Sequence, residues 1–549
     1  MFLALCVLCA HEVTRDIDRL TALTFDVLVV GGGIYGLAIA YDAAQRGLAV
    51  ALIERDDFGS GSSFNHLRTI HGGLRYLRTF DIRRARESVR ERATLARIAP
   101  HAVKPMSFAL PLYRSLRAGK TAMRAGLLLD RLVSFDRNRG ISSSLRLPPG
   151  RVLSRAEAVQ RFPGLRRQGL TGAAVWFDYL TPESDRLTFS FATAADEHGA
   201  ALANHLEAVS LLTDRKRVTG VLARDRQTGK ELDIAARLTV NATGASVDGL
   251  LAPLGISMRM PLLKAMNLVT RRDAGEEALG GRAPSGRHLF LVPWRGRALL
   301  GTWESDRAMD ANALDVIPRE IESFISELNQ TFPALDLAPS DVSFVHRGIV
   351  PAARTATGGV RLEGRDRVSD HAVDGIDGLL SVAGTKYTTA RAVAERLVDL
   401  GLEKLGRPRV PCRTAARPLP GGSVRDLALT VAEARRDHDE GLPSDTIPHL
   451  VAAYGSRYRD VLSLAHGRPG WRMRLAESSP VIGAELAWAA RKEMAITLSD
   501  AVIRRTPLGA LGYPGDTTVE RAAQIVGDEL SWSGERRRHE IAAVKEFYA

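Results

Sequence analysis

Cysteine is scarce in this sequence. The 549 residues include three, Cys6, Cys9 and Cys412, which are too few and too widely spaced for a disulfide framework or a metal site. We therefore expect a chain that folds in a reducing compartment and binds no metal. Its length predicts two to four domains whose cores are large enough to need no covalent crosslinks.

Long hydrophobic runs are also absent. Residues 1–10 are apolar, but they are far shorter than a membrane span, and no basic residue precedes them as in a signal peptide. We interpret residues 1–24 as a disordered N-terminal extension. No other segment is apolar for long enough to cross a bilayer, so we expect a cytoplasmic protein whose contact with a membrane is peripheral.

Acidic residues are in the minority. The 75 Lys and Arg outnumber the 63 Asp and Glu and give a net charge of +12, which favours an anionic partner: a substrate, a membrane surface or nucleic acid. Much of the excess lies between Ser115 and Arg167, where 12 basic residues face three acidic ones. These cations are not interleaved with aromatic residues and accompany no nucleic-acid-binding motif, so we expect no nucleic-acid partner.

Within this basic segment, residues 126–135 predict an apolar helix flanked by arginines. Such a helix can lie on an anionic lipid surface, where each nearby cation contributes about 1 kcal/mol. It can equally be a core helix with solvated flanks. The sequence alone leaves both interpretations open.

A strand–turn–helix motif opens the first domain. Residues 26–30 form a short apolar run, residues 37–44 are good helix formers, and residues 49–53 suit a second strand that leads to Glu54. The first turn has a Gly-x-Gly-x-x-Gly sequence: Gly31, Gly33 and Gly36. Such a turn directs main-chain N–H groups at a pyrophosphate, and an acid after the second strand accepts hydrogen bonds from a ribose. The motif therefore predicts dinucleotide binding.

A glycine-rich stretch follows, and a helix is expected after it over residues 81–99. The stretch contains these small and polar residues: Ser62, Ser63, His71, Gly72, Gly73, Arg75 and Tyr76. Small residues let the backbone approach a flat ring or a ribityl chain closely. The density of polar side chains favours a binding site over a plain connection.

Two later strands also end in tight turns. Residues 238–241 lead into Ala242-Thr243-Gly244, and residues 379–383 lead into a turn with Gly384, Lys386 and Thr388. A helix that begins after the second turn would stabilise negative charge at its N-terminus. Lys386 could do the same or bind a substrate anion, because lysine is rarely buried for purely structural reasons.

Together these motifs resemble those of the FAD-dependent, respiratory glycerol-3-phosphate dehydrogenases. The likeness rests on Gly-Gly-Gly-Ile-Tyr-Gly at 31–36, Ile-His-Gly-Gly-Leu-Arg-Tyr-Leu at 70–77 and Arg-Glu-Arg at 90–92, and it continues to residues 504–506. It implies an α/β fold with an FAD-binding Rossmann-like domain of glutathione-reductase type, an antiparallel-sheet substrate cap and an all-α C-terminal domain. It also implies that the dinucleotide is FAD.

From the resemblance we expect the FAD-binding domain to comprise residues 25–92, 170–255 and 345–405. The cap would comprise residues 93–169 and 256–344. Residues 406–549 would form the helical domain, with helices near these segments: 424–438, 444–454, 484–498 and 519–548.

The motifs and the resemblance assign residues to three roles. The residues expected to bind FAD are Gly31, Gly33, Gly36, Glu54, Arg55, Ser62, Ser63, His71, Gly72, Gly73, Ala242, Thr243, Gly244, Gly384, Lys386 and Thr388. Those expected to bind the substrate are Arg75, Tyr76, Arg347, Arg365 and Lys386. Those expected to act in catalysis are His71, Arg75, His346, Arg365 and Lys386.

Two substitutions depart from the family pattern. Where the resemblance implies an active-site arginine this chain has Val350, and where it implies a histidine it has Asn267. His346 and Arg347 are candidate replacements near the first position. Either His71 or His346 could accept the substrate proton, because histidine titrates near neutral pH, but each could equally be a packed, hydrogen-bonded ring.

The leading hypothesis is oxidation of sn-glycerol 3-phosphate to dihydroxyacetone phosphate, with electrons passed to quinone by a protein peripherally bound to the inner membrane. The resemblance implies the quinone and the membrane. An alternative keeps FAD but oxidises another anionic polyol, hydroxy acid or amine, with quinone or O2 as acceptor. A third is a redox-silent flavin-binding scaffold. A homodimer is one assembly that the sequence leaves open.

Overall fold

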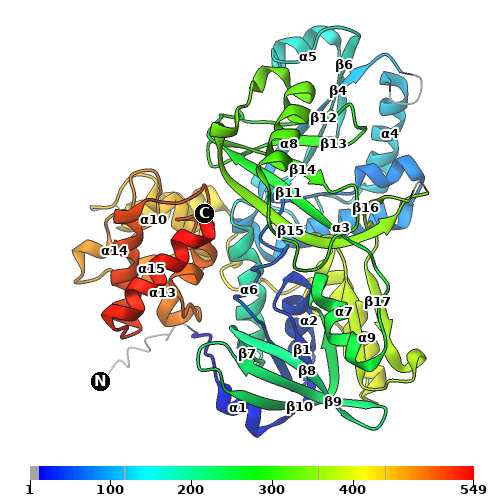
Figure 1. The fold of residues 1–549 in the computed structure, drawn as a ribbon. Helices are drawn as coiled ribbons and strands as arrows, with labels where there is room; N and C mark the ends of the chain where they lie inside the picture. The colour runs from blue at the N-terminus through cyan, green and yellow to red at the C-terminus, as the bar shows by residue number, and fades with distance from the viewer. Residues whose placement is uncertain (1–10, 116–118, 357, 439–440) are drawn as a thin grey trace.

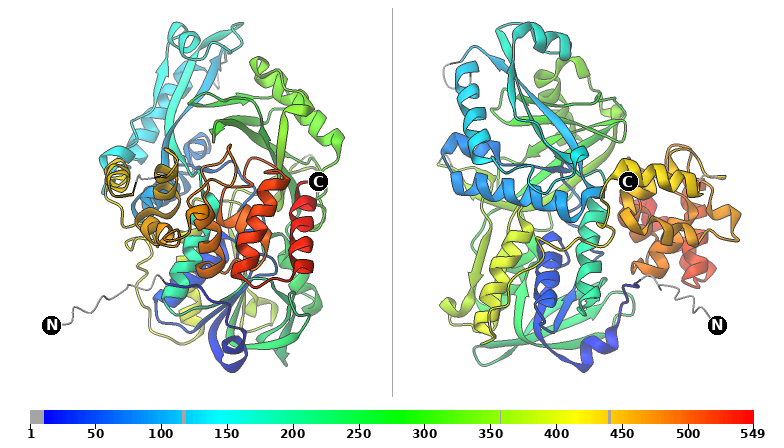
Figure 2. Two further views of the ribbon diagram at one scale, coloured as in Figure 1. Left: turned by 90° about the vertical axis from the view of Figure 1, so that its left-hand side faces the viewer. Right: turned by 180° about the vertical axis from the view of Figure 1, so that it is seen from behind.

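Two β-sheets and a group of helices make up the computed structural model, which describes residues 11–115, 119–356, 358–438 and 441–549 (Figure 1). The glycine turn lies in the lower sheet of Figure 1, and the second sheet lies above it. The C-terminal helices stand to one side of both, as the two further views show (Figure 2). The predicted three-part α/β architecture is confirmed.

The first sheet has eight strands and carries the dinucleotide motif. Five of them run parallel, in the order β18 (Leu379–Ala383), β10 (Glu231–Asn241), β1 (Thr24–Val30), β2 (Val50–Ile53) and β7 (Ala201–Ala203). The antiparallel strands are β17 (Arg367–Asp370), β8 (Leu206–Asp214) and β9 (Arg217–Asp225). Six of the seven residues of β1 are buried, which explains its continuous apolar sequence.

Helices cover one face of this sheet and the β8–β9 hairpin covers the other. The helices are α2 (Ile34–Gln45), α6 (Ser184–Glu197) and α9 (Ala390–Lys404). They share a core with Val27 and Val29 of β1, whereas Leu28 and Val30 pack toward the hairpin. Because successive side chains of a strand point to opposite faces, β1 joins both layers.

The second sheet has ten strands. Nine follow the order β16, β15, β11, β14, β13, β12, β4, β6 and β3, and β5 pairs with β6. The strands are β3 (Thr69–Ile70), β4 (Lys104–Tyr113), β5 (Arg151–Leu153), β6 (Leu170–Leu180), β11 (Leu262–Thr270), β12 (Ala278–Arg282), β13 (His288–Trp294), β14 (Arg297–Glu304), β15 (Val342–Arg354) and β16 (Val360–Leu362). Neighbours are antiparallel except β12 and β4, in agreement with the predicted cap.

The strand pairing corrects two predicted domain limits. Strand β6, the C-terminal part of β15 and strand β16 belong to the second sheet, although residues 170–255 and 345–405 were expected in the first domain. These strands are held by ladders to β4 and β11, and such long-range pairing leaves no local mark in the sequence.

The N-terminal segment is also corrected. Helix α1 (Ile17–Ala22) packs at β10, with Leu20 fully buried. Val13 is buried as well, and its main-chain N–H donates to the carbonyl of Lys492 at 3.1 Å. The chain from residue 11 onward is therefore part of the fold rather than a disordered extension. Residues 1–10, with Cys6 and Cys9, lie outside the described residues.

The C-terminal domain is helical, as predicted. Its helices are α10 (Leu427–His438), α11 (Thr446–Tyr454), α12 (Tyr458–Ser463), α13 (Gly483–Lys492), α14 (Asp516–Glu529) and α15 (Gly534–Tyr548). The segment 519–548 forms two helices instead of one, because Ser533 caps a new helix by accepting the N–H of Arg536 at 3.1 Å.

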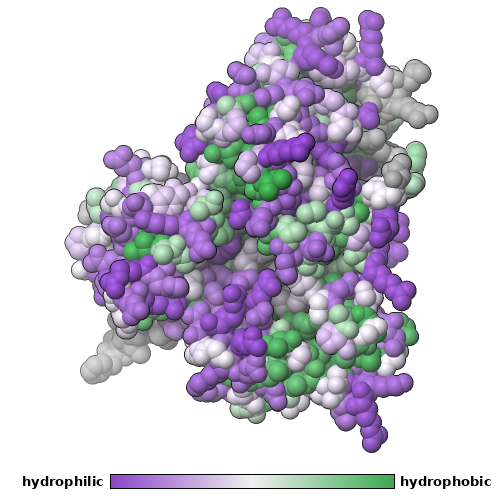
Figure 3. Space-filling view, in the orientation of Figure 1, coloured by the Kyte–Doolittle hydropathy of each residue, from purple (hydrophilic) through white to green (hydrophobic). Residues whose placement is uncertain are grey.

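Figure 3 shows the surface of the molecule in the orientation of Figure 1. Hydrophilic residues cover much of this face, and the hydrophobic ones form separate patches between them.

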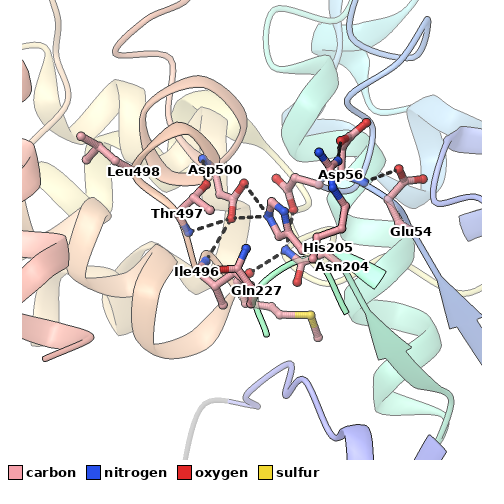
Figure 4. A network of polar contacts seen from close by, with 12 residues as sticks. Glu54, Asp56, Asn204, His205, Gln227, Ile496, Thr497, Leu498 and Asp500 are labelled. Carbon is pink, nitrogen blue, oxygen red and sulfur yellow. Dashed lines mark hydrogen bonds and ion pairs between the residues drawn. The ribbon is translucent and has the colours of Figure 1, made fainter. Parts of the chain in front are cut away.

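Buried polar contacts fix this helical domain to the first sheet. Arg505 donates two hydrogen bonds to Asp57, at 2.5 and 2.8 Å. Nearby, the Nε2 atom of His205 lies 3.0 Å from a carboxylate oxygen of Asp500, which also accepts the N–H groups of Ile496 and Thr497 (Figure 4). Asp500 begins a π-helical turn, and its carboxylate both holds the main chain just before this turn and joins the two domains.

The His205–Asp500 contact predicts a pH-dependent stability. Burial lowers the pKa of His205, but the charge and hydrogen bond of Asp500 outweigh it and raise the pKa above its usual value. The contact therefore stabilises the fold fully below the unfolded-state pKa of about 6.5, and this contribution is lost as the pH rises through the folded-state pKa. A substitution to Asn is suited to testing this contact, because Asn tolerates the left-handed φ of +51° that His205 adopts.

We therefore expect His205→Asn to lower the free energy of unfolding by about 1 kcal/mol at pH 6 and by clearly less at pH 9. Urea unfolding of both proteins at the two pH values measures this difference. In an Asp500→Asn background the pH dependence of the effect should vanish. An equal loss at pH 6 and pH 9 would contradict the assignment.

Candidate active site

The first glycine turn packs tightly against neighbouring main-chain atoms. Gly31 has a φ of +107°, and a Cβ there would lie 2.7 Å from the carbonyl oxygen of Ala242. A Cβ on Gly36 would lie 1.9 Å from the carbonyl oxygen of Gly31. Gly33 is the N-cap residue of α2 and has no side chain to cover the helix start. The turn thus presents bare backbone at the positive end of a helix, as a pyrophosphate requires.

An acid and a hydroxyl flank this turn. Glu54, at the end of β2, accepts the N–H of Gly32 at 2.6 Å and that of Asp56 at 2.9 Å, and burial raises its pKa. The hydroxyl of Ser63 accepts the N–H of Ile34 at 3.0 Å, directly at the helix start. Both residues contact the glycine turn, and their roles in binding the cofactor stay predictions.

The turn after β18 meets the first glycine turn. A Cβ on Gly384 would lie 2.3 Å from the phenol oxygen of Tyr35, which donates to the carbonyl of Lys386 at 3.2 Å. Burial raises the pKa of Tyr35, so this phenol is a neutral donor. The main-chain N–H of His71 donates to the hydroxyl of Thr388 at 3.2 Å. Three predicted segments far apart in sequence are thereby brought together.

This arrangement fits FAD. Added Cβ atoms would fill the cradle at Gly31, Gly36 and Gly384, an acid follows the second strand, and α2 begins directly after the glycine turn. Thr243 and Gly244 continue the turn that touches Gly31. One residue predicted to bind the cofactor is not directed at the glycine turn: Arg55 lies at the surface and pairs with Asp56 at 3.3 Å. The remaining residues are suited to hold a dinucleotide.

His71 is held by a buried carboxylate. Its Nδ1 atom lies 3.3 Å from Asp178, and its Nε2 atom lies 2.7 Å from the hydroxyl of Thr69. The side chain of His71 is 46% exposed, whereas that of Asp178 is 3% exposed. The carboxylate selects the tautomer with its N–H at Nδ1, so Nε2 carries a lone pair that accepts the hydroxyl of Thr69 and could accept a proton in its place.

Asp178 remains charged despite its burial. Burial acts to raise its pKa, but the charge of Arg92 and the hydrogen bond from His71 hold the pKa below its usual value. The N–H of Gly72 donates to it at 2.7 Å and the indole N–H of Trp176 at 3.2 Å. The sequence analysis did not single out Asp178; its signal was an acid inside the apolar run of β6.

Cations gather around one phenol beside His71. The ammonium of Lys386 lies 4.2 Å from the ring centre of Tyr76, and Arg75 donates to the phenol oxygen at 3.4 Å. The guanidinium of Arg84 lies 5.3 Å from the same ring centre. Burial acts to raise the pKa of Tyr76, but the charges of Arg75 and Lys386 outweigh it and lower the pKa. We call these four residues, Arg75, Tyr76, Arg84 and Lys386, the tyrosine-centred cation cluster.

The cap sheet turns one face toward this region. A Cβ on Gly348 would lie 3.6 Å from Ser62 of the glycine-rich stretch. Alternation along β15 and pairing with β11 put Val350 and Asn267 on that same face. Val350 packs with Leu263 in a small apolar cluster, and the Oδ1 atom of Asn267 accepts the hydroxyl of Thr302 at 2.8 Å. The face therefore lacks the arginine and histidine that the family pattern implies.

Two predicted residues on β15 are corrected. Arg347 pairs with Met266, which packs against α8 (Pro318–Thr331), so Arg347 lies on the opposite face of the sheet from Asn267 and is not placed to bind the substrate. His346 is on the correct face but is fully buried, and burial lowers its pKa well below the usual value. Such a ring is a weak base and is closed to solvent, whereas the side chain of His71 is 46% exposed. The role of His71 as proton acceptor stays a prediction.

Arg365 lies at the edge of the region. It follows β16 and is exposed, and its main-chain N–H donates to Glu363 at 3.0 Å. The hydroxyl of Thr385 donates to the carbonyl of Glu363 at 2.6 Å, which ties this segment to the turn of Lys386. The segment of Arg365 is thus held beside the cluster, while the role of its side chain stays a prediction.

Comparisons with known proteins agree with this geometry. A family model described as FAD dependent oxidoreductase matches residues 26–400, and one described as the C-terminal domain of alpha-glycerophosphate oxidase matches residues 412–537. A glycerol-3-phosphate dehydrogenase from Synechocystis is 32% identical over 97% of this chain and 98% of its own length. The mitochondrial glycerol-3-phosphate dehydrogenase of Mus musculus is 33% identical over 95% of this chain and 73% of its own length.

A solved structure shows the same fold. The glycerol-3-phosphate dehydrogenase from Bacillus halodurans, complexed with FAD, aligns with a TM-score of 0.76 at 26% identity, over 97% of this chain and 96% of its own. The match extends through both sheets and the helical domain.

Proposed function

The chain belongs to the FAD-dependent glycerol-3-phosphate dehydrogenases, with FAD as its cofactor, and we propose that it oxidises sn-glycerol 3-phosphate to dihydroxyacetone phosphate. The observation that carries this proposal is the tyrosine-centred cation cluster beside His71. Thr388, two residues after Lys386, accepts the main-chain N–H of His71 at 3.2 Å. Lys386, a candidate ligand of the substrate anion, and His71, the candidate proton acceptor, therefore both contact or belong to the turn of residues 384–388.

Bound FAD supplies the chemistry of hydride acceptance from the substrate carbon. The side chains do the rest. Arg75 and Lys386 would bind the phosphate, because cationic donors form strong hydrogen bonds to its oxygens. His71 would take the hydroxyl proton on Nε2 while Asp178 accepts the hydrogen bond from Nδ1. Asp178 is a positioning residue in this scheme, since it acts through the ring of His71.

A second candidate keeps the cofactor and changes the substrate to another anionic polyol, a hydroxy acid or an amine. Val350 and Asn267 favour it, because both replace polar groups that the family pattern implies and both are engaged in other contacts. A redox-silent scaffold would have no need of a buried carboxylate that holds an open histidine.

Turnover separates these candidates. Holoenzyme supplied with glycerol 3-phosphate and a soluble quinone analogue should form dihydroxyacetone phosphate as the quinone is reduced. A larger kcat/KM for another anionic alcohol or amine would favour the second candidate. If the FAD-loaded protein oxidises none of these substrates, the hypothesis of a redox-silent scaffold is favoured.

We further propose that the enzyme binds the cytoplasmic face of the inner membrane and reduces quinone there. No helix in the described residues is both long and apolar enough to span a bilayer. Helix α4 (Lys120–Val133) exposes Leu128 and Leu132, which are 61% and 65% exposed. Its other face packs through Leu129 against the turn that carries Tyr76, so a membrane at α4 would lie close to the site.

A vesicle experiment tests the membrane proposal. The wild type should sediment with anionic phospholipid vesicles at low salt and be released by salt, since Arg124 and Arg131 on α4 are exposed. A Leu128→Asp/Leu132→Asp variant should bind at least about tenfold more weakly, because apolar burial is lost. Leu429→Asp, at a leucine 59% exposed on the helical domain, is the matched control. Equal binding by all three proteins would exclude α4.

A further inference from the structure

The arginine that the family pattern implies at position 350 has a neighbour across the sheet edge. Strands β15 and β16 pair Ala352 with Leu362, and the N–H of Glu363 donates to the carbonyl of Pro351 at 3.0 Å. Gly364 follows this contact by one residue, so it lies at the edge of the cap sheet near the part of β15 that carries Val350. A group beside the missing side chain of Gly364 is therefore at that edge.

Arg84 fills that place from another element. Its Nη1 atom lies 3.4 Å from where a Cβ of Gly364 would be, and its guanidinium lies 5.3 Å from the ring centre of Tyr76. Arg84 belongs to the first turn of α3 (Ile82–Ile98), where Asp81 lies 3.3 Å from its Nε atom. A guanidinium is therefore present at the edge of the cap sheet near Val350, although residue 350 does not supply it.

The charge balance favours an anion at this point. Arg75, Arg84 and Lys386 surround the phenol of Tyr76, and Asp81 is the carboxylate paired with Arg84. Two cationic charges remain for a ligand, which matches the dianion of a phosphate monoester. The planar guanidinium offers parallel N–H groups to two phosphate oxygens.

We propose that Arg84 binds the phosphate of the substrate in place of the arginine missing at position 350. This inference rests on the proposed function for the class of substrate. It makes Arg84 a specificity-determining residue, supplied by helix α3 instead of the cap sheet. The substitution at Val350 then relocates an anion contact without removing it.

The test measures anion binding without turnover. Titration calorimetry of FAD-loaded enzyme with inorganic phosphate should show binding to the wild type and roughly 10- to 100-fold weaker binding to Arg84→Leu, the range for a lost charge-assisted hydrogen bond. Arg84→Lys, which keeps a charge, should lose less. Arg83→Leu, at an exposed neighbour on the same helix, is the matched control and should bind as the wild type does.

A double variant tests whether phosphate binding lost in Arg84→Leu can be restored. Arg84→Leu/Val350→Arg should bind phosphate more tightly than Arg84→Leu alone, because it returns a guanidinium to the same edge of the cap sheet. Equal phosphate binding by Arg84→Leu and Arg83→Leu, or no binding by the wild type, would overturn the proposal. If glycerol 3-phosphate is not oxidised but phosphate binding follows this pattern, the proposed substrate fails while the role of Arg84 stands.

Discussion

Replacing His71 with Asn is expected to slow reduction of the bound flavin by substrate by about 100- to 10,000-fold, the usual contribution of a positioned general base. The reason is geometric. The side chain of His71 is 46% exposed, its Nε2 atom contacts the hydroxyl of Thr69 at 2.7 Å, and its Nδ1 atom faces the charged Asp178 at 3.3 Å. Asn cannot accept the hydroxyl proton at that position.

Stopped-flow absorbance under anaerobic conditions measures this rate. The variant should keep its flavin, because the contact of residue 71 with Thr388 uses the main chain. Asp178→Asn should give a smaller loss, since it misorients the ring but leaves it in place. His466→Asn, at an exposed histidine of the helical domain, should have no effect. A His71→Asn rate within threefold of the wild type would remove His71 from the proton-transfer step.

Replacing Gly36 with Ala is expected to leave a protein with little or no bound FAD. The added Cβ would lie 1.9 Å from the carbonyl oxygen of Gly31, a main-chain atom that cannot swing aside. The turn must then move away from the pyrophosphate position, and we expect FAD affinity to fall about 100-fold, the upper end of the cost of overpacking. The flavin absorbance per mole of purified protein gives the readout.

A glycine in open space provides the control. Gly249 lies in α7 (Val247–Leu251) of the same domain, and the position of its missing Cβ is free of heavy atoms within 4 Å. Gly249→Ala should therefore retain its flavin. Added FAD should raise the melting temperature of this control but not that of Gly36→Ala. A yellow Gly36→Ala protein with normal FAD content would contradict the proposed cradle.

The parts of the site that could be predicted from the sequence are those built by local pattern. The glycines of the first turn, Glu54 and the turn of Gly384 each follow a short apolar strand, and the structure brings them together through Ala242 and Tyr35. A strand that enters a helix fixes the direction of its turn, so local order is sufficient there.

The parts that could not be predicted depend on long-range pairing. Arg347 and His346 alternate along β15, but only the register with β11 decides that His346, and not Arg347, shares the face of Asn267. Asp178 reaches His71 because β6 pairs with β3 and β4. Arg84 reaches the edge of the cap only through the packing of α3. Composition and motif spacing carry no information on such contacts between residues far apart in the sequence.

The divergence of the cap face is also clearer in three dimensions. From the sequence, Val350 and Asn267 look like the loss of a substrate site. In the structure the cations around Tyr76 are present, and the histidine that we propose as proton acceptor, His71, follows β3 and belongs to neither β11 nor β15. The two substitutions therefore change the cap sheet, while the residues around Tyr76 and His71 come from other segments.

The most direct test of the central claim is anaerobic mixing of the holoenzyme with glycerol 3-phosphate while the flavin absorbance at about 450 nm is followed. Rapid bleaching, lost in His71→Asn, is the result predicted here. A flavin that stays oxidised with glycerol 3-phosphate, but is bleached by another anionic alcohol or an amine, would contradict the assigned substrate.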